Sequence, residues 1–160
     1  MGTTTFEQSA AKLGGETTVR GVLATICEEL VALLDATACA VSRVVGDLLV
    51  GLDEHTLSRR PLEYGHEYLI PDYPVTQEVV ESGEPRQVSR LDPAADPTET
   101  ALLEKLGFES LLMVCLPSGG ACWGLVEVYT EKGRFEDGQP ELVQRLARLA
   151  GERLEQLERP

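Results

Sequence analysis

The 160-residue sequence predicts an α+β domain built on an antiparallel sheet of five to six strands. Apolar residues with helical spacing occupy both ends of the chain, and two segments between them have the pattern of β-hairpins. This order of elements suits a sheet that carries both terminal helices on one face. The middle of the chain is then left for the opposite face, where we expect it to enclose a ligand pocket.

Composition excludes several classes of partner. Hydrophobic residues make up 42% of the chain and charged residues 26%, as in ordinary globular domains. The net charge of -13 repels phosphate backbones and anionic lipids, so we expect neither nucleic acid nor a membrane as partner. The N-terminus has no signal-peptide or lipidation pattern, so a cytoplasmic location is expected.

The N-terminal part of the chain predicts a leader and a helix. The first 15 residues are small and polar and end in Gly14-Gly15, so we expect a flexible leader before a single domain over residues 16–160. Between residues 18 and 34, apolar residues recur at alternating spacings of four and three in two stripes, which predicts a helix. One stripe should cover the sheet. The other would be exposed on a monomer, which suggests a partner helix.

A hairpin and a tyrosine-rich loop come next. The apolar runs Ala38–Val45 and Leu48–His55 flank Gly46-Asp47 and predict a strand, a tight turn and a strand. Residues 56–73 lack periodicity but contain Tyr64, His66, Tyr68 and Tyr73. We expect these four side chains to line the pocket, although the tyrosines could merely anchor the loop and His66 could be an ordinary surface residue.

Proline and glycine delimit the elements of the middle segment. A helix is predicted between Pro74 and Gly83, because proline is favoured at the first helical position and glycine just after the last. Residues 86–89 suggest a short strand. The segment Asp96–Glu99 predicts the start of another helix, since the aspartate can accept hydrogen bonds from free backbone amides, and Gly107 predicts its end.

The segment from residue 111 to residue 130 predicts a second hairpin with its turn at Pro117 to Gly120. Period-two alternation places Glu127 and Tyr129 on one strand face and the valines beside them on the other. Because the valines should face the helices, Glu127 and Tyr129 are expected to face the pocket. There the carboxylate could accept a hydrogen bond from a ligand or pair with Arg43, or simply occupy a salt bridge or solvated edge.

The C-terminal helix is predicted from Pro140 to about Glu158, again with two apolar stripes. Both terminal helices thus carry more apolar width than one sheet face needs. We therefore expect a homodimer held together by a bundle of the terminal helices.

Three runs of this sequence resemble the GAF domain family of bacterial sensor kinases, diguanylate cyclases and transcription regulators. The runs are YPVTQEVVESGEPRQV, DPAADPTETALLEKLGFESLLMVCL and GGACWGLVEVYTEKGRF, and the resemblance extends from about Thr17 to Glu158. It implies a PAS-like (profilin-like) fold and a sensory domain that regulates an effector domain or protein. Family members bind cyclic nucleotides, bilins, haem or other small molecules, or have no known ligand, so the cofactor is unknown.

Comparison with the family narrows the ligand mainly by exclusion. Cyclic-nucleotide-binding members carry an asparagine where this chain has Thr130, although Lys132 and Phe135 match their pattern. Bilin-attaching members and methionine-sulfoxide-reductase members need a cysteine in the middle segment, and this chain has none between Ala40 and Val114. The resemblance therefore leaves an unidentified small molecule as the expected ligand.

The four cysteines, Cys27, Cys39, Cys115 and Cys122, lie in apolar segments, which predicts buried free thiols. A thiol redox sensor using Cys115 and Cys122 is the less favoured alternative, because whether they can pair depends on the register of the hairpin. His55 has no second ligand set at a recognisable spacing, so no metal site is expected.

No hydrolase, metalloprotease or nucleotide-binding motif is present, so no catalytic residue is predicted and we expect a non-enzymatic domain. The candidate pocket residues are Tyr64, His66, Tyr68, Tyr73, Arg43, Glu127 and Tyr129. The alternative function is a pure dimerisation or protein-interaction domain that binds no ligand.

Overall fold

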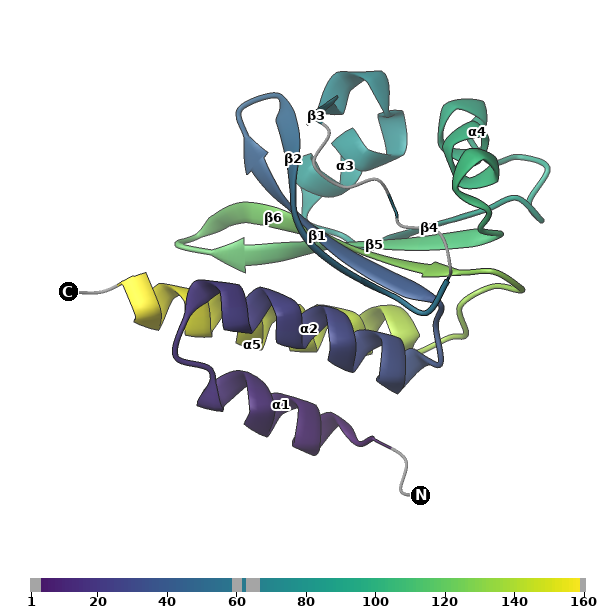
Figure 1. The fold of residues 1–160 in the computed structure, drawn as a ribbon. Helices are drawn as coiled ribbons and strands as arrows, with labels where there is room; N and C mark the ends of the chain where they lie inside the picture. Colours follow the sequence, from purple (N-terminus) through teal and green to yellow (C-terminus); the bar gives the residue numbers. More distant parts are fainter. Residues whose placement is uncertain (1–3, 59–61, 63–66, 159–160) are drawn as a thin grey trace.

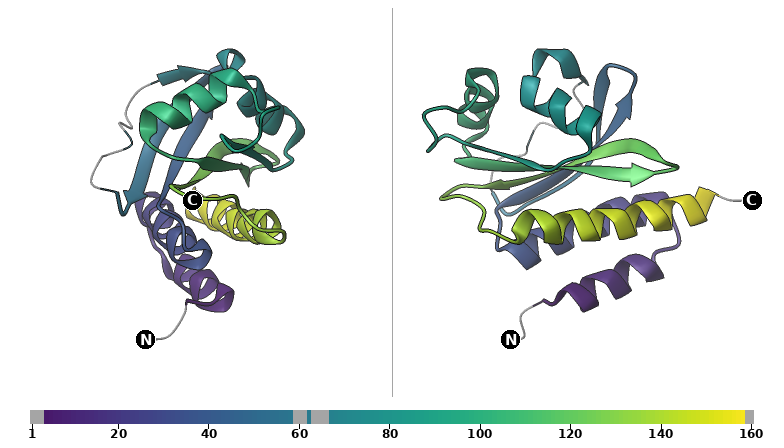
Figure 2. Two further views of the ribbon diagram at one scale, coloured as in Figure 1. Left: turned by 90° about the vertical axis from the view of Figure 1, so that its right-hand side faces the viewer. Right: turned by 180° about the vertical axis from the view of Figure 1, so that it is seen from behind.

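The computed structural model describes residues 4–58, 62 and 67–158, and it has a layered architecture (Figure 1). A sheet lies in the middle, two long helices cover one face, and shorter elements cover the other. A further helix packs outside the two long ones. The predicted α+β class is confirmed, with the terminal helices and the middle segment on opposite faces of the sheet (Figure 2).

The sheet has six strands in the order β3-β2-β1-β6-β5-β4, and every neighbouring pair is antiparallel. The two predicted hairpins form its centre, because β1 of the first pairs with β6 of the second and Ala40 lies opposite Glu127. The strands are β1 (Ala38–Val45), β2 (Leu48–Thr56), β3 (Glu67–Leu69), β4 (Arg86–Ser89), β5 (Ser110–Ser118) and β6 (Ala121–Thr130).

Helices α2 (Val19–Leu34) and α5 (Gln139–Glu158) cover one face of the sheet. Thr18 caps α2, since its hydroxyl oxygen accepts a hydrogen bond from the Gly21 amide at 3.0 Å. The apolar stripes of both helices pack with the helix-facing residues of β1, β5 and β6 in one core cluster. Burying these side chains removes apolar surface from water, the main force that holds this layer together.

Residues expected to form part of a flexible leader instead form helix α1 (Phe6–Gly15). Thr5 and Gln8 make a reciprocal capping box at its start, and Leu13 is buried in the core shared by α2 and α5. The Ser9 hydroxyl donates to Glu29 Oε1 at 2.9 Å, and Lys12 Nζ lies 3.3 Å from Glu29 Oε2. The second stripe of α2 is therefore covered by α1 and not left exposed. The domain boundary at residue 16 stays a prediction.

The opposite face carries the 3₁₀-helix η1 (Ile70–Asp72), α3 (Pro74–Ser82) and α4 (Pro97–Leu106). As predicted, α3 and α4 are each followed by a glycine with positive φ, Gly83 at 73° and Gly107 at 87°. Asp96 caps α4 by accepting from two backbone amides. These elements pack on the sheet in a second apolar cluster, distinct from the first.

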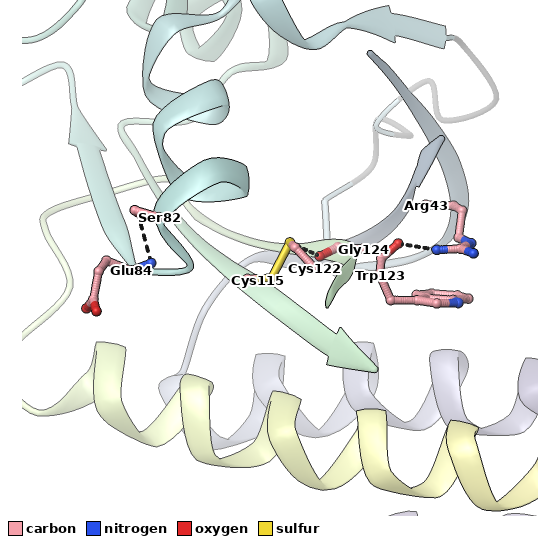
Figure 3. Close-up of a disulfide and its surroundings, with 7 residues drawn as sticks. All are labelled: Arg43, Ser82, Glu84, Cys115, Cys122, Trp123 and Gly124. Carbon is pink, nitrogen blue, oxygen red and sulfur yellow. Dashed lines mark hydrogen bonds between the residues drawn. A yellow bond between two sulfur atoms is a disulfide. The ribbon is translucent and has the colours of Figure 1, made fainter. Parts of the chain in front are cut away.

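The β5–β6 hairpin contains a disulfide between Cys115 and Cys122, so the prediction of free thiols is wrong for this pair (Figure 3). Turning at Gly119-Gly120 would offset the two residues by two positions. The hairpin does turn there, and Cys122 lies opposite Pro117, two residues from Cys115. The two Cα atoms nevertheless lie 5.7 Å apart, within the usual range for a disulfide. Cys27 and Cys39 are free and buried, as predicted. The Cys39 side chain and burial raise the pKa of the Cys27 thiol.

Within the described ranges, no helix combines the length and apolar character needed to cross a membrane. In the same part of the chain, His, Cys, Asp and Glu side chains form no group of three or more that could hold a metal ion.

Candidate functional site

A pocket lies on the sheet face opposite α2 and α5. Strands β2 and β6 form its floor, and η1, α3 and α4 form its walls. Its apolar lining residues are Leu49, Leu62, Ile70, Leu102 and Leu106. Its polar and aromatic lining residues are Tyr68, Tyr73, Thr76, Glu99, Glu127 and Tyr129. An apolar enclosure with a few convergent polar groups is the usual form of a small-molecule site.

The pocket is narrow in this conformation. The space open to the centre of a water-sized molecule is about 20 Å³, which suffices for roughly one water. A larger ligand therefore needs an outward movement of the walls. The walls belong to short elements, η1, α3 and α4, and not to the two long helices.

The most buried polar group of the pocket is the carboxylate of Glu99, on the first turn of α4, which is 1% exposed. Its Oε1 accepts two hydrogen bonds from Thr76 of α3, at 3.2 Å from the backbone amide and at 2.9 Å from the hydroxyl. Burial raises the pKa of Glu99, and the hydrogen bonds from Thr76 oppose this shift. Glu99 thus joins α3 to α4 at the wall of the pocket.

A second carboxylate, that of Glu127, lies in the floor and is 7% exposed. The Tyr129 hydroxyl donates to its Oε2 at 3.0 Å. The Tyr129 ring packs against the Phe108 ring, with centroids 4.9 Å apart. Phe108 follows α4 and Gly107 in the sequence, so the end of α4 contacts the floor of the pocket through this pair.

Two further tyrosines form the rim. Tyr68 of β3 and Tyr73, between η1 and α3, meet edge to face with ring centroids 5.8 Å apart. Burial raises the pKa of Tyr73, and the charges of Glu99, Asp72 and Glu127 raise it further. The Tyr73 phenol therefore lies within electrostatic reach of both carboxylates.

The structure brings four of the seven predicted pocket residues together: Tyr68, Tyr73, Glu127 and Tyr129. Their side chains line one cavity, as the strand alternation and the loop composition indicated. Whether they contact a ligand stays a prediction. Tyr64 and His66 lie outside the described residues.

Arg43 does not line the pocket, and the possible pairing with Glu127 is not formed. Strand alternation groups Arg43 with Cys39 and Val41, which face the helix-covered side of the sheet. Its Nη1 donates to the Trp123 carbonyl at 2.7 Å, and its guanidinium lies 4.3 Å from the Trp123 ring centroid (Figure 3). Because every second residue of a strand faces the same side of the sheet, the sequence alone could have placed Arg43 on the side of Cys39 and Val41.

Sequence reasoning missed Thr76 and Glu99 as pocket residues. Glu99 occupies the third position of α4, where a glutamate commonly caps a helix, and this local role sufficed to explain it. Its actual partner, Thr76, is 23 residues away in the sequence. Only the packing of α3 beside α4 shows that the carboxylate faces a cavity.

Comparisons with known proteins agree with this architecture. A search of curated protein sequences found no match. One similar solved structure is that of a protein in its far-red absorbing dark state with bound biliverdin IXa. It has a TM-score of 0.81 and 15% sequence identity, and the match covers 96% of this chain and 99% of that one.

Two bacteriophytochrome structures give a similar result. The chromophore-binding domain of an unusual bacteriophytochrome from R. palustris has a TM-score of 0.82 at 12% identity, covering 96% of this chain and 61% of that one. The chromophore-binding domain of the Stigmatella aurantiaca bacteriophytochrome, a Thr-to-His mutant in the Pr state, has a TM-score of 0.74 at 15% identity. The match covers 95% of this chain and 58% of that one. At such identities the likeness shows the fold alone.

The family model named GAF domain matches residues 18–154, which include α2, all six strands, the pocket and most of α5. The chain therefore belongs to the GAF domain family.

Proposed function

We propose that this GAF domain is a non-enzymatic sensor that binds a small molecule in the pocket and regulates an effector domain or protein. The observation that carries the proposal is the pair of buried carboxylates, Glu99 and Glu127, in an otherwise apolar and aromatic enclosure. Buried charge lowers stability unless it is compensated, so such groups are typical of functional sites.

A bilin of the kind named for one structural neighbour does not fit the residues present. The cavity has room for about one water, and its lining includes two carboxylates, which would repel the carboxylates of an open-chain tetrapyrrole. The sequence also lacks a cysteine between Ala40 and Val114 for covalent attachment. We therefore assign a smaller ligand to this pocket.

Signal transmission follows from the position of the central strands. Leu125 and Tyr129 of β6 face the pocket-side core, whereas Val126 and Val128 of the same strand face the helices. A ligand that displaces the floor or wall of the pocket thus changes the packing under α2 and α5. Because the ligand favours the conformation in which the pocket is open, binding shifts the population of helix arrangements.

The proposal predicts that a small molecule raises the unfolding temperature of the purified chain. A thermal-shift screen over cyclic nucleotides, amino acids, flavins, haem, amines and small aromatics measures this, since a ligand of the folded state stabilises it according to its excess over Kd. A reproducible, saturable shift supports the sensor. If no compound shifts the unfolding temperature, the alternative of a ligand-free dimerisation or interaction domain is favoured.

The proposal includes a cytoplasmic homodimer formed by the terminal helices. Helix α5 carries three leucines, Leu142, Leu149 and Leu157, that pack against the core but are only partly buried within one chain. A second copy would cover them. Light scattering coupled to size-exclusion chromatography should give twice the chain mass of 17.4 kDa. A strict monomer at high concentration would remove the dimer from the proposal and leave the pocket untouched.

A further inference from the structure

We infer that the disulfide between Cys115 and Cys122 is a reversible modification site, which exchanges with small thiols such as glutathione and thereby changes how α5 packs on the sheet. The inference goes beyond the proposed function, because it concerns a chemical input that acts apart from the pocket and its ligand. It follows from where the disulfide lies in the β5–β6 hairpin and from what the chain between the two cysteines contacts.

The hairpin does not depend on the disulfide for its pairing. Strands β5 and β6 pair along their whole length, and residues 111–116 of β5 are buried. The two cysteines are only seven positions apart in the sequence. Because a cross-link stabilises a fold less when the loop it closes is shorter, this disulfide contributes less stability than a long-range one would. A role other than stability is therefore the better explanation for the pair.

The pair lies at the solvent-exposed end of the hairpin. Cys122 is half-buried and the neighbouring Gly119, Gly120 and Ala121 are exposed, whereas Cys115 is buried. A thiol in solution therefore reaches the Cys122 sulfur first. Exposed disulfides are typically the labile and regulatory ones. In a reducing compartment such as the cytoplasm proposed for this domain, disulfides are mostly transient and redox-sensing.

The exchange balances in two steps. A glutathione thiolate attacks the Cys122 sulfur, which forms a mixed disulfide, breaks the bond to Cys115 and leaves Cys115 as a thiolate that takes up a proton. A second glutathione thiolate attacks the glutathione sulfur of the mixed disulfide and releases Cys122, which is protonated in turn. The two glutathione thiols lose two electrons and become oxidised glutathione. The reverse sequence closes the disulfide again.

The chain between the two cysteines contacts α5. The Pro117 carbonyl oxygen approaches Gly151 so closely that a Cβ atom there would lie 1.7 Å from it. The Ser118 hydroxyl also donates to the Gly151 carbonyl oxygen at 3.3 Å. Leu116 belongs to the core cluster on the helix side of the sheet. Because packed interiors transmit displacement, a movement of this segment moves the helix that rests on it.

The disulfide fixes the end of the hairpin in one geometry. Cys115 lies opposite Leu125 and Cys122 lies opposite Pro117, so the bond joins a diagonal pair whose Cα atoms are 5.7 Å apart. Reduction removes this constraint, and the end of the hairpin gains conformational freedom. The oxidised form therefore holds α5 more firmly than the reduced form. Since α5 also belongs to the proposed dimer, redox state and pocket occupancy act on the same helix.

Thiol trapping tests the chemistry. The purified full chain is equilibrated in glutathione buffers of increasing reduced-to-oxidised ratio, and free thiols are then alkylated with iodoacetamide and located by mass spectrometry. We expect Cys115 and Cys122 to pass together from protected to alkylated, and back when the ratio is reversed. The buried Cys27 and Cys39 should stay unmodified and serve as the internal control. A pair that stays closed, or stays open, at every ratio overturns the inference.

Hydrogen exchange of the folded chain tests the effect on α5. In the reduced form, the amides of α5 around Gly151 should exchange about fivefold faster, or more, than in the oxidised form, as for two coupled sites. Helix α4 lies on the opposite face of the sheet and should exchange equally in both forms. If opening the disulfide leaves the exchange of α5 unchanged, the link to the helix is wrong and the inference is overturned.

The variant Cys122→Ser assigns the effect to this pair. It cannot close the disulfide, and its half-buried position accommodates the serine hydroxyl. Its α5 amides should exchange like those of the reduced wild type, with or without reductant. An α5 that exchanges as in the oxidised wild type contradicts the inference. A response of this variant to reductant assigns the effect to Cys27 and Cys39 instead, and also overturns it.

Thermal unfolding in both redox states checks that the fold is intact. The reduced wild type should still unfold cooperatively, because the strand pairing and both core clusters remain. Loss of cooperative unfolding on reduction identifies a structural disulfide and overturns the inference. None of these outcomes affects the ligand screen, so the pocket proposal stands or fails separately.

Discussion

Substitution of Gly151 by alanine is expected to destabilise the domain by about 3 kcal/mol or more. Gly151 lies where α5 crosses the end of β5, and a Cβ atom there would lie 1.7 Å from the Pro117 carbonyl oxygen. That distance is far inside van der Waals contact, and the obstacle is backbone, which cannot rotate away. Helix α5 would have to move off the sheet, with loss of the packing around Leu154 and Ala150.

Chemical denaturation measures this loss. Gly14→Ala is the matched control, since Gly14 is also a helical glycine but has no heavy atom within 4 Å of its would-be Cβ. Because alanine is the better helix former, the control should be unchanged or up to about 1 kcal/mol more stable. If Gly151→Ala unfolds within about 0.5 kcal/mol of the wild type, the close approach of α5 to β5 is wrong.

Phe108→Ala should lose about 3–5 kcal/mol of stability, the usual cost of removing a buried aromatic ring. Phe108 is 2% exposed and packs against Tyr129, whose hydroxyl group in turn contacts Glu127. The substitution leaves a cavity beside Tyr129, in the core on the pocket side of the sheet. Phe108→Leu, which keeps most of the apolar volume, should lose only roughly 1–2 kcal/mol.

The same variant connects stability to the site. An apolar cavity of this kind stays dry and can bind a small aromatic molecule, so benzene should raise the unfolding temperature of Phe108→Ala more than that of the wild type. Equal loss of stability in the alanine and leucine variants would contradict the close packing of Phe108 beside Tyr129.

Local chemistry allowed much of the fold to be predicted. The boundaries of α3 and α4 follow from Pro74, Gly83, Asp96 and Gly107, because capping and positive-φ positions act within a few residues of chain. Both hairpins and the opposite faces of β6 followed from alternation. Helix ends and strand alternation depend on residues that are close in the sequence, which is why the sequence alone predicts them.

What the sequence did not reveal depends on tertiary contacts. Helix α1 has only two large apolar residues, Phe6 and Leu13, and its place is fixed by the distant Glu29. The disulfide between Cys115 and Cys122 joins residues that are not directly opposite in the hairpin, and alternation alone does not predict such a diagonal pair. The contact between Glu99 and Thr76 at the pocket wall depends on the packing of α3 beside α4.

The most direct test of the ligand site is a ¹H–¹⁵N NMR titration of the full chain with a compound that raises its unfolding temperature in the ligand screen. The account predicts saturable shifts centred on the amides of Thr76, Glu99, Glu127 and Tyr129, with smaller changes spreading to α5 across the sheet. Saturable shifts confined to the surfaces of α1, α2 and α5, with those four amides unchanged, would contradict it.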